Sequence, residues 1–123
     1  MTMRYTGAVL DAPDARELAD FYRRLLRWEV LEDSPDWVSL HEPGGTGRLS
    51  FQTEKLYRRP AWPAEADAQL MMAHLDIEVD DLQAELAHAV EEGAEVARFQ
   101  PQERVRVCLD PAGHPFCLWV REG

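Results

Sequence analysis

The feature that most constrains the fold of this chain is an order of predicted elements that occurs twice. Each half begins with a short strand pattern, continues with a capped helix pattern, and ends with three short strand patterns separated by turn residues. Asp14 and Asp81 stand at equivalent helix starts, and the residues seven positions before them are Gly7 and His74. We therefore predict one domain over residues 1–123, made of two fused modules that cover about 1–56 and about 70–123.

In the first module, apolar spacing predicts a helix over about 15–26, with Asp14 as its N-cap and Glu17 in the capping-box position. A short apolar run around Leu10 precedes this helix. Three strands are predicted after it, at 28–31, 37–41 and 49–53. The stretch 54–69 has neither the apolar spacing of a helix nor the alternation of a strand, and it is predicted to be an ordered connecting loop.

In the second module, alternating residues predict a strand over 74–79, and Asp80 is predicted to cap a helix that ends at Gly93. Three more strands are predicted at 96–99, 104–109 and 116–120. A helix would then cover one face of each four-stranded sheet. We therefore expect an α+β fold in which two tandem βαβββ modules form a curved sheet around a central cavity.

The charge and cysteine content exclude several classes of protein. A formal net charge of −10 opposes a general affinity for nucleic-acid phosphates, which relies on clustered Lys and Arg. No signal-peptide pattern is present, and no apolar run approaches the roughly 20 residues that span a bilayer. We expect a cytoplasmic protein with no nucleic-acid or membrane partner, in which Cys108 and Cys117 are reduced.

Six segments are informative when they are taken together in chain order. They are Leu10-Asp11-Ala12-Pro13-Asp14, Phe21-Tyr22, Leu49-Ser50-Phe51-Gln52, Trp62-Pro63, His74-Leu75-Asp76 and Asp110-Pro111-Ala112-Gly113-His114-Pro115-Phe116-Cys117-Leu118. Their order and spacing resemble the glyoxalase-like subgroup of the glyoxalase / bleomycin-resistance / extradiol-dioxygenase superfamily, whose fold is also called vicinal oxygen chelate. The resemblance implies the two-module fold, and with the open sheet edges it leads us to expect a homodimer.

The resemblance also implies where a metal would bind, because metal-dependent members place ligands on the first and last strand of each module. Those positions here are Gly7, Gln52, His74 and Cys117. Glycine has no side-chain donor, Gln52 offers a weak neutral oxygen, and Cys117 replaces the carboxylate that would hold a hard cation. We therefore predict no metal and no cofactor.

His74 is the candidate catalytic residue. Strand alternation puts it on one face with Asp76 and Glu78, opposite the residues expected beneath the helix, so His74 is predicted to face the cavity. Three roles are open for it: a hydrogen-bonded wall residue, an acid/base or substrate-binding group, and a metal ligand.

Arg104 and Arg106 alternate with Val105 and Val107 and so lie on the same face of the predicted strand as Cys108. They are predicted to face the cavity, where they could bind a carboxylate or phosphate. An internal salt-bridge ladder with Asp76 and Glu78 is the alternative. The complete set of predicted ligand-binding residues is Trp37, Ser39, Gln52, Trp62, His74, Arg104, Arg106, Cys117 and Trp119.

The two cysteines lie opposite each other if the last hairpin is symmetric about Ala112 and Gly113, but two free thiols are favoured over a disulfide. A nucleophilic Cys117 would need a neighbour that lowers its pKa. The tryptophans could form aromatic walls for an organic ligand, or they could fill the cavity or an oligomer interface.

These residues predict a metal-independent pocket for an aromatic or anionic small molecule, and the resemblance implies a binding protein of the resistance type. The alternative that the resemblance implies is a lyase, isomerase or dioxygenase that uses His74, with Gln52 positioning the substrate and any divalent metal weakly held. A third class is an interaction module whose cavity is packed shut; the cavity volume distinguishes it from the other two.

Overall fold

The computed structural model describes residues 2–121, which divide into two compact units, Met1–Tyr57 and Arg58–Gly123. Each unit contains one helix and one four-stranded sheet, so the α+β class and the two βαβββ modules are confirmed. Within the described residues, neither helix is long and apolar enough to cross a membrane.

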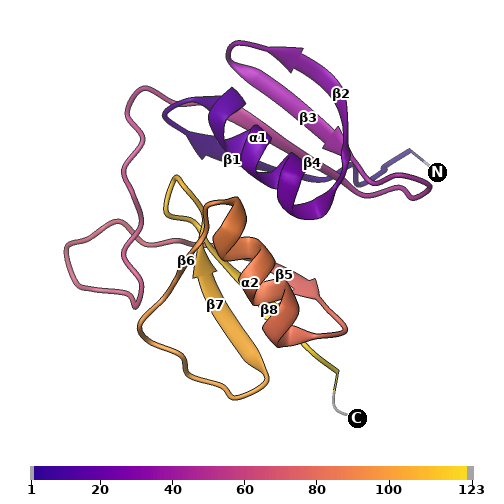
Figure 1. The fold of residues 1–123 in the computed structure, drawn as a ribbon. Helices are drawn as coiled ribbons and strands as arrows, with labels where there is room; N and C mark the ends of the chain where they lie inside the picture. Colours follow the sequence, from indigo (N-terminus) through magenta and orange to yellow (C-terminus); the bar gives the residue numbers. More distant parts are fainter. Residues whose placement is uncertain (1, 122–123) are drawn as a thin grey trace. The chain divides into compact units, whose positions relative to one another are not determined.

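The first module contains β1 (Ala8–Ala12), α1 (Ala15–Leu26), β2 (Glu29–Ser34), β3 (Trp37–His41) and β4 (Arg48–Thr53). Its sheet has the order β1-β4-β3-β2, in which β1 runs parallel to β4 and the other pairs are antiparallel. Figure 1 shows α1 lying across one face of this sheet. The first and last strands are therefore neighbours, and α1 carries the chain from β1 across the sheet to β2 at the opposite edge.

The second module repeats this arrangement with β5 (Leu75–Glu78), α2 (Leu82–Glu92), β6 (Glu95–Val96), β7 (Val105–Leu109) and β8 (Pro115–Trp119). The sheet order is β5-β8-β7-β6, with β5 parallel to β8. As Figure 1 shows, α2 covers one face of it.

The core of the first module lies between α1 and its sheet. Tyr22 is fully buried, with its ring 4.9 Å from that of Phe21 in an edge arrangement and 5.5 Å from that of Phe51 in a stacked one. Val38 and Leu40 complete the buried face of β3. Strand alternation therefore leaves the opposite face of the sheet to the remaining side chains.

Several predicted boundaries differ from the structure. Strand β2 continues to Ser34, where the prediction ended at residue 31, and two other differences have an identifiable cause. The N-cap of α2 is Asp81 and not Asp80, since the Asp81 carboxylate accepts a hydrogen bond from the backbone N–H of Ala84. Strand β6 stops at Val96, because the N–H of Val107 donates to the side-chain oxygen of Gln100 and not to the backbone of Ala97, although the Ala97 N–H still donates to the Val107 carbonyl.

The turn between β7 and β8 is organised by Asp110, which is buried. One oxygen of its carboxylate accepts hydrogen bonds from the N–H groups of Ala112 (3.0 Å) and His114 (2.9 Å). The Asp110 N–H also donates to the carbonyl of His114, so these two residues face each other across the turn. Gly113 has φ +90° and lies against the side chain of Arg59, so a Cβ there would clash.

The cap assignment predicts different effects for two neighbouring aspartates. Replacing Asp81 by alanine should lower the free energy of unfolding by about 1 kcal/mol, because an orphaned amide at the start of α2 loses its acceptor. Asp80→Ala removes the same charge one residue earlier and should have almost no effect. Urea denaturation of both variants and the parent measures the difference; equal losses would contradict the assignment.

Candidate functional site

The open face of the second sheet carries the residues singled out at the sequence level. The register pairs Asp76 with Cys117 and Glu78 with Trp119, so these four side chains share one face. Phe116 and Leu118 alternate with them and are buried on the side that α2 covers. The predicted alternation of this strand is therefore confirmed.

A cavity of about 300 Å³ lies against this open face. It is lined by His74, Asp76, Gln102, Arg104, Val105, Cys117, Trp119 and Val120. Four of the predicted ligand-binding residues thus come together within one module. Asp76 and Gln102 belong to the same cavity and were not in the predicted set, although Asp76 stands two residues after His74 in an alternating strand, and that spacing already placed it on the same face.

The polar centre of the cavity is formed by His74, Asp76 and Cys117. Nε2 of His74 lies 3.0 Å from Oδ1 of Asp76, and one potential ligand atom of each of the three residues lies within 4.8 Å of the other two. The carboxylate can therefore orient the imidazole, and the thiol lies close to both.

Both thiols are less acidic than an ordinary cysteine. Burial raises the pKa of the Cys117 thiol, and the negative charge of Asp76 raises it further. Cys108 is fully enclosed, and burial, followed by the proximity of Cys117, raises its pKa to about 11. At neutral pH both are thiols and poor nucleophiles, because the thiolate is the reactive form.

The two cysteines do not oppose each other, contrary to the symmetric hairpin expected from the sequence. Cys108 pairs with Phe116, and Cys117 pairs with Val107, because the turn is centred on Ala112. The two thiols are therefore on opposite faces of the sheet, and both are free.

Arg104 and Arg106 are separated for the same reason. Arg106 pairs with Leu118 on the helix side of the sheet, and its guanidinium donates to the backbone carbonyls of Gln102, Glu103 and Val105. The prediction that Arg106 faces the cavity is therefore wrong. Arg104 precedes β7, so strand alternation does not fix its direction, and it lines the cavity.

The alternative salt-bridge ladder does not form either. Glu78 is paired with Arg121, at 2.9 and 3.1 Å, and the Arg121 guanidinium also lies 5.8 Å from the centre of the Trp119 ring. Among residues 2–121, the guanidinium of Arg104 has no hydrogen bond or ion pair, so it is a cation at the cavity edge with no internal partner.

The first module presents its own open face, which carries Trp37 and Gln52 as a directly paired couple. The Gln52 amide donates to Asp11 at 2.7 Å, and the Trp37 indole N–H donates to Glu32 at 3.3 Å. Ser39 is fully buried, and its hydroxyl is hydrogen-bonded to another serine on the paired strand. Each of these predicted ligand-binding groups already has a partner within its module.

Trp62 belongs to the second unit and lies within the loop that connects β4 to β5. Its indole N–H donates to the carbonyl of Phe99 at 3.3 Å, and the two rings lie 6.1 Å apart. This contact anchors the loop, and Trp62 is not among the residues that line the cavity described above.

The structure bears on the metal positions implied by the resemblance. Gly7 in the first module corresponds to His74 in the second. The residue two positions after His74 is Asp76, which pairs with Cys117, and the residue two positions after Gly7 is Val9, which pairs with Ser50. By register, Ser50 and not Gln52 is the counterpart of Cys117.

These first-module positions do not fit a metal. The Ser50 hydroxyl is bonded to Ser39 at 2.7 Å. Gly7 has φ +148°, and a Cβ there would lie 2.3 Å from the carbonyl oxygen of Arg48, so the backbone leaves no room for a ligand side chain. In the second module a cation would have to displace the proton of a thiol whose pKa is raised.

Comparison with known proteins identifies the family. The family described as glyoxalase-like domain matches residues 7–119. The chain belongs to this family. The superfamily predicted from the sequence is thereby confirmed. No curated protein matches the chain by sequence.

Solved structures of the superfamily share the fold at low sequence identity. A glyoxalase family protein from Enterococcus faecalis has 20% identity and a TM-score of 0.69, over 96% of this chain and 98% of that one. A glyoxalase/bleomycin resistance protein/dioxygenase family enzyme from Burkholderia phytofirmans PsJN has 14% identity and a TM-score of 0.71, over 94% and 96%. A glyoxalase-related enzyme from Fulvimarina pelagi has 15% identity and a TM-score of 0.70, over 97% and 88%.

The charge of Asp76 predicts the reactivity of Cys117. In Asp76→Asn the thiol loses a negative neighbour, its pKa falls, and the thiolate fraction rises at any pH below that pKa. Alkylation of Cys117 by iodoacetamide at pH 8 should therefore accelerate by at least about twofold. Peptide mapping by mass spectrometry separates Cys117 from the buried Cys108.

Glu78→Gln is the matched control, because it removes one negative charge from the same face and leaves the charge of Asp76, which raises the pKa of Cys117, in place. It should leave the alkylation rate unchanged. An equal acceleration in both variants would mean that the general field of the face, and not the Asp76 contact, holds the pKa up.

Proposed function

We propose that this glyoxalase-like domain binds a small organic anion with an aromatic part on the open face of its second sheet, without a metal ion. The observation that carries the proposal is the guanidinium of Arg104, which has no hydrogen bond or ion pair among the described residues and lies at the edge of a cavity that the ring of Trp119 also lines. A carboxylate or phosphate would supply the missing partner of the arginine, and an aromatic ring would pack against the indole.

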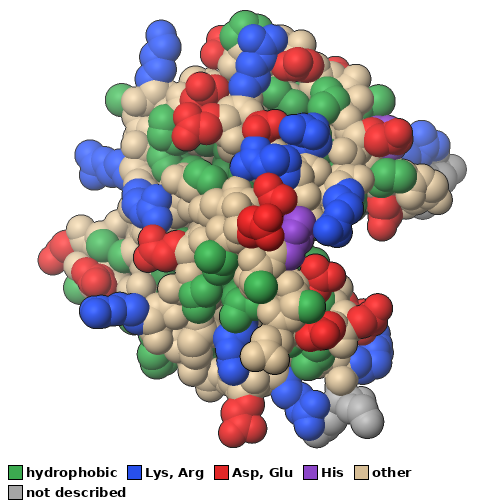
Figure 2. Space-filling model, in the orientation of Figure 1, with side chains coloured by type: hydrophobic (Ala, Val, Ile, Leu, Met, Phe, Trp, Pro, Cys, Tyr) green, Lys and Arg blue, Asp and Glu red, His purple; other side chains and the backbone are tan. Residues whose placement is uncertain are grey.

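The size and polarity of the cavity support this reading over a packed interaction module. Its volume of about 300 Å³ is at the lower end of the range for small-molecule sites. Because the chain carries a net charge of −10, an anion needs a local cation to approach, and Arg104 is suited to this role. Figure 2 shows acidic and basic side chains interspersed over the visible surface, so such local positive positions exist despite the overall charge.

The contact between His74 and Asp76 favours an enzyme as the second candidate. A histidine oriented by a carboxylate is a common general base, and the contact with Asp76 uses Nε2 of His74, not Nδ1. Such a site could move a proton in an isomerase or lyase reaction on the same anionic ligand. Conversion of a bound ligand, followed by proton NMR and lost in His74→Ala, would favour the enzyme over the binding protein.

The binding proposal is tested with 2-naphthoate, an aromatic carboxylate. It should quench tryptophan fluorescence in the parent protein, and Arg104→Gln should weaken its affinity about tenfold, because a charge-assisted pair is lost. The quenching should shrink in Trp119→Phe, which places the signal at the cavity.

Arg98→Gln is the matched control, since Arg98 is exposed in the same module and lies outside the cavity lining. It should bind 2-naphthoate as the parent does. Equal weakening in both arginine variants, or tighter binding of 2-naphthylmethylamine than of 2-naphthoate, would contradict the proposal.

The metal-free part of the proposal is tested by elemental analysis of protein purified without a metal-binding tag. We expect only trace first-row metal, equal in the parent and in His74→Ala, Cys117→Ala and Gln52→Ala. Zinc is the competitor to watch, because imidazole and thiolate are good zinc ligands. About one equivalent in the parent that disappears in His74→Ala and Cys117→Ala would overturn the metal-free reading.

Pairing of two chains stays a prediction. It is motivated by the open sheet edges, which are β1 and β2 in the first sheet and β5 and β6 in the second.

A further inference from the structure

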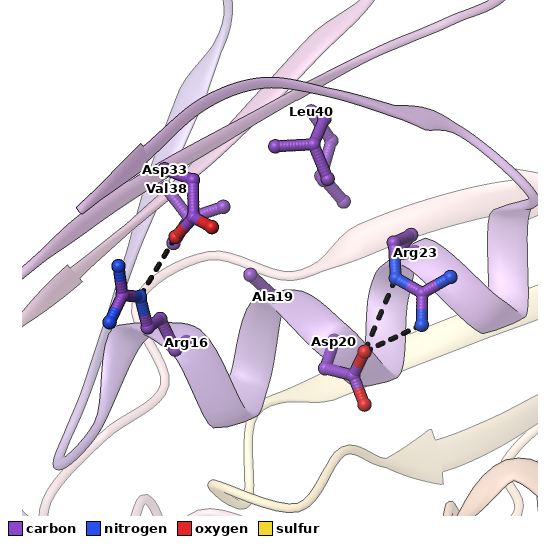
Figure 3. Close-up of a pocket in the computed structure, with 8 residues that line it drawn as sticks. Arg16, Ala19, Asp20, Arg23, Asp33, Val38 and Leu40 are labelled. Carbon is purple, nitrogen blue, oxygen red and sulfur yellow. Dashed lines mark hydrogen bonds and ion pairs between the residues drawn. The ribbon is translucent and has the colours of Figure 1, made fainter. Parts of the chain in front are cut away.

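A second groove lies in the first module, on the helix side of its sheet and therefore away from the open face. It has a volume of about 310 Å³ and runs between α1 and the β2–β3 hairpin (Figure 3). Its apolar lining is Ala19, Val30, Val38 and Leu40, of which Val30 alone is exposed.

The groove exists because α1 does not cover the edge strand. Val30 pairs with Leu40, which is fully buried on the helix side, yet Val30 itself is 48% exposed. A bulge between Val30 and Glu32 shifts the register of β2, and the facing helix position is the small residue Ala19. Val30 therefore lies on the helix side of the sheet but stays exposed to solvent, because the helix residue beside it, Ala19, has a short side chain.

The groove is bordered by charged groups, as Figure 3 shows. Nε of Arg16 donates to Asp33 at 2.8 Å, and Arg23 donates to Asp20 at 2.7 and 3.2 Å. Arg24 also contacts Asp20. The groove lining itself therefore holds two guanidinium groups, Arg16 and Arg23, and two carboxylates, Asp20 and Asp33, so a ligand anion must bind to donors that these pairs leave over.

Arg16 is the group best able to bind a ligand. Among residues 2–121 its two terminal nitrogens have no hydrogen-bond partner, since the contact with Asp33 uses Nε alone. An arginine has five N–H donors, and exposed ion pairs contribute about 0–1 kcal/mol, so a carboxylate can join or replace Asp33 at little cost.

We propose that this groove binds a medium-length aliphatic carboxylate. The hydrocarbon chain lies along Ala19, Val30 and Val38, and the carboxylate pairs with Arg16. An aliphatic chain fits because the surface is built from methyl and methylene groups with no aromatic ring, and burial of the exposed part of Val30 provides the apolar gain. The site lies wholly within the first module, so its test is independent of ligand binding in the second.

The experiment titrates octanoate into protein with labelled Val, Leu and Ala methyl groups and follows carbon–proton NMR spectra. Octanoate should shift the methyl signals of Val30, Val38 and Ala19 and leave those of Leu118 in place. Arg16→Gln should weaken binding about fivefold, which corresponds to about 1 kcal/mol for one exposed charge-assisted contact. Arg27→Gln, at the end of the same helix and outside the groove, should bind as the parent does.

Ala19→Leu is the variant that blocks the groove, because the larger side chain occupies the space beside Val30. It should abolish the octanoate shifts while the methyl signals of Leu118 keep their folded positions, which excludes misfolding as the cause. Octanoate shifts that persist in Ala19→Leu would overturn the proposal. So would equally strong binding of 1-octanol, which lacks the charge, or equal losses in Arg16→Gln and Arg27→Gln.

Discussion

Parallel pairing of the first and last strands of each module is the constraint on which the rest of the structure depends. Parallel neighbours cannot be joined by a tight turn, so the chain must leave the sheet and return through a helix. The helix then covers one face, and strand alternation gives every residue either to that covered face or to the open one. The pairing of β5 with β8 thereby brings Asp76 beside Cys117 and forms the centre of the candidate site.

The two modules use this common frame differently. In the second, the open face keeps a histidine, a carboxylate and a thiol around a cavity with a cation at its edge. In the first, the corresponding positions are a glycine pressed against a backbone carbonyl and a serine bonded to its neighbour. The same scaffold therefore occurs twice, while among the described residues the group of histidine, carboxylate and thiol is found in the second module.

Much of the fold could be predicted because local and tertiary preferences agree. The bounds of α1 and β3 follow from apolar spacing and a capping aspartate, and the structure has the same residues there. The failures occur where a tertiary contact decides the outcome. The side chain of Gln100 ends β6, and the turn at Asp110 sets a register that pure symmetry misses, so Arg106 lies on the helix side and not in the cavity. Asp76 is a different case, because strand alternation alone already placed it on the face of His74.

The buried carboxylate of Asp110 has a consequence for the redox behaviour of the chain. By holding the turn centred on Ala112, it keeps Cys108 and Cys117 on opposite sides of one sheet. A slip of one residue would bring them face to face across the hairpin, since such a slip turns every side chain of a strand to the other side. A single acidic side chain thus insulates two thiols from each other, and oxidation could cross-link them only by first breaking the hairpin.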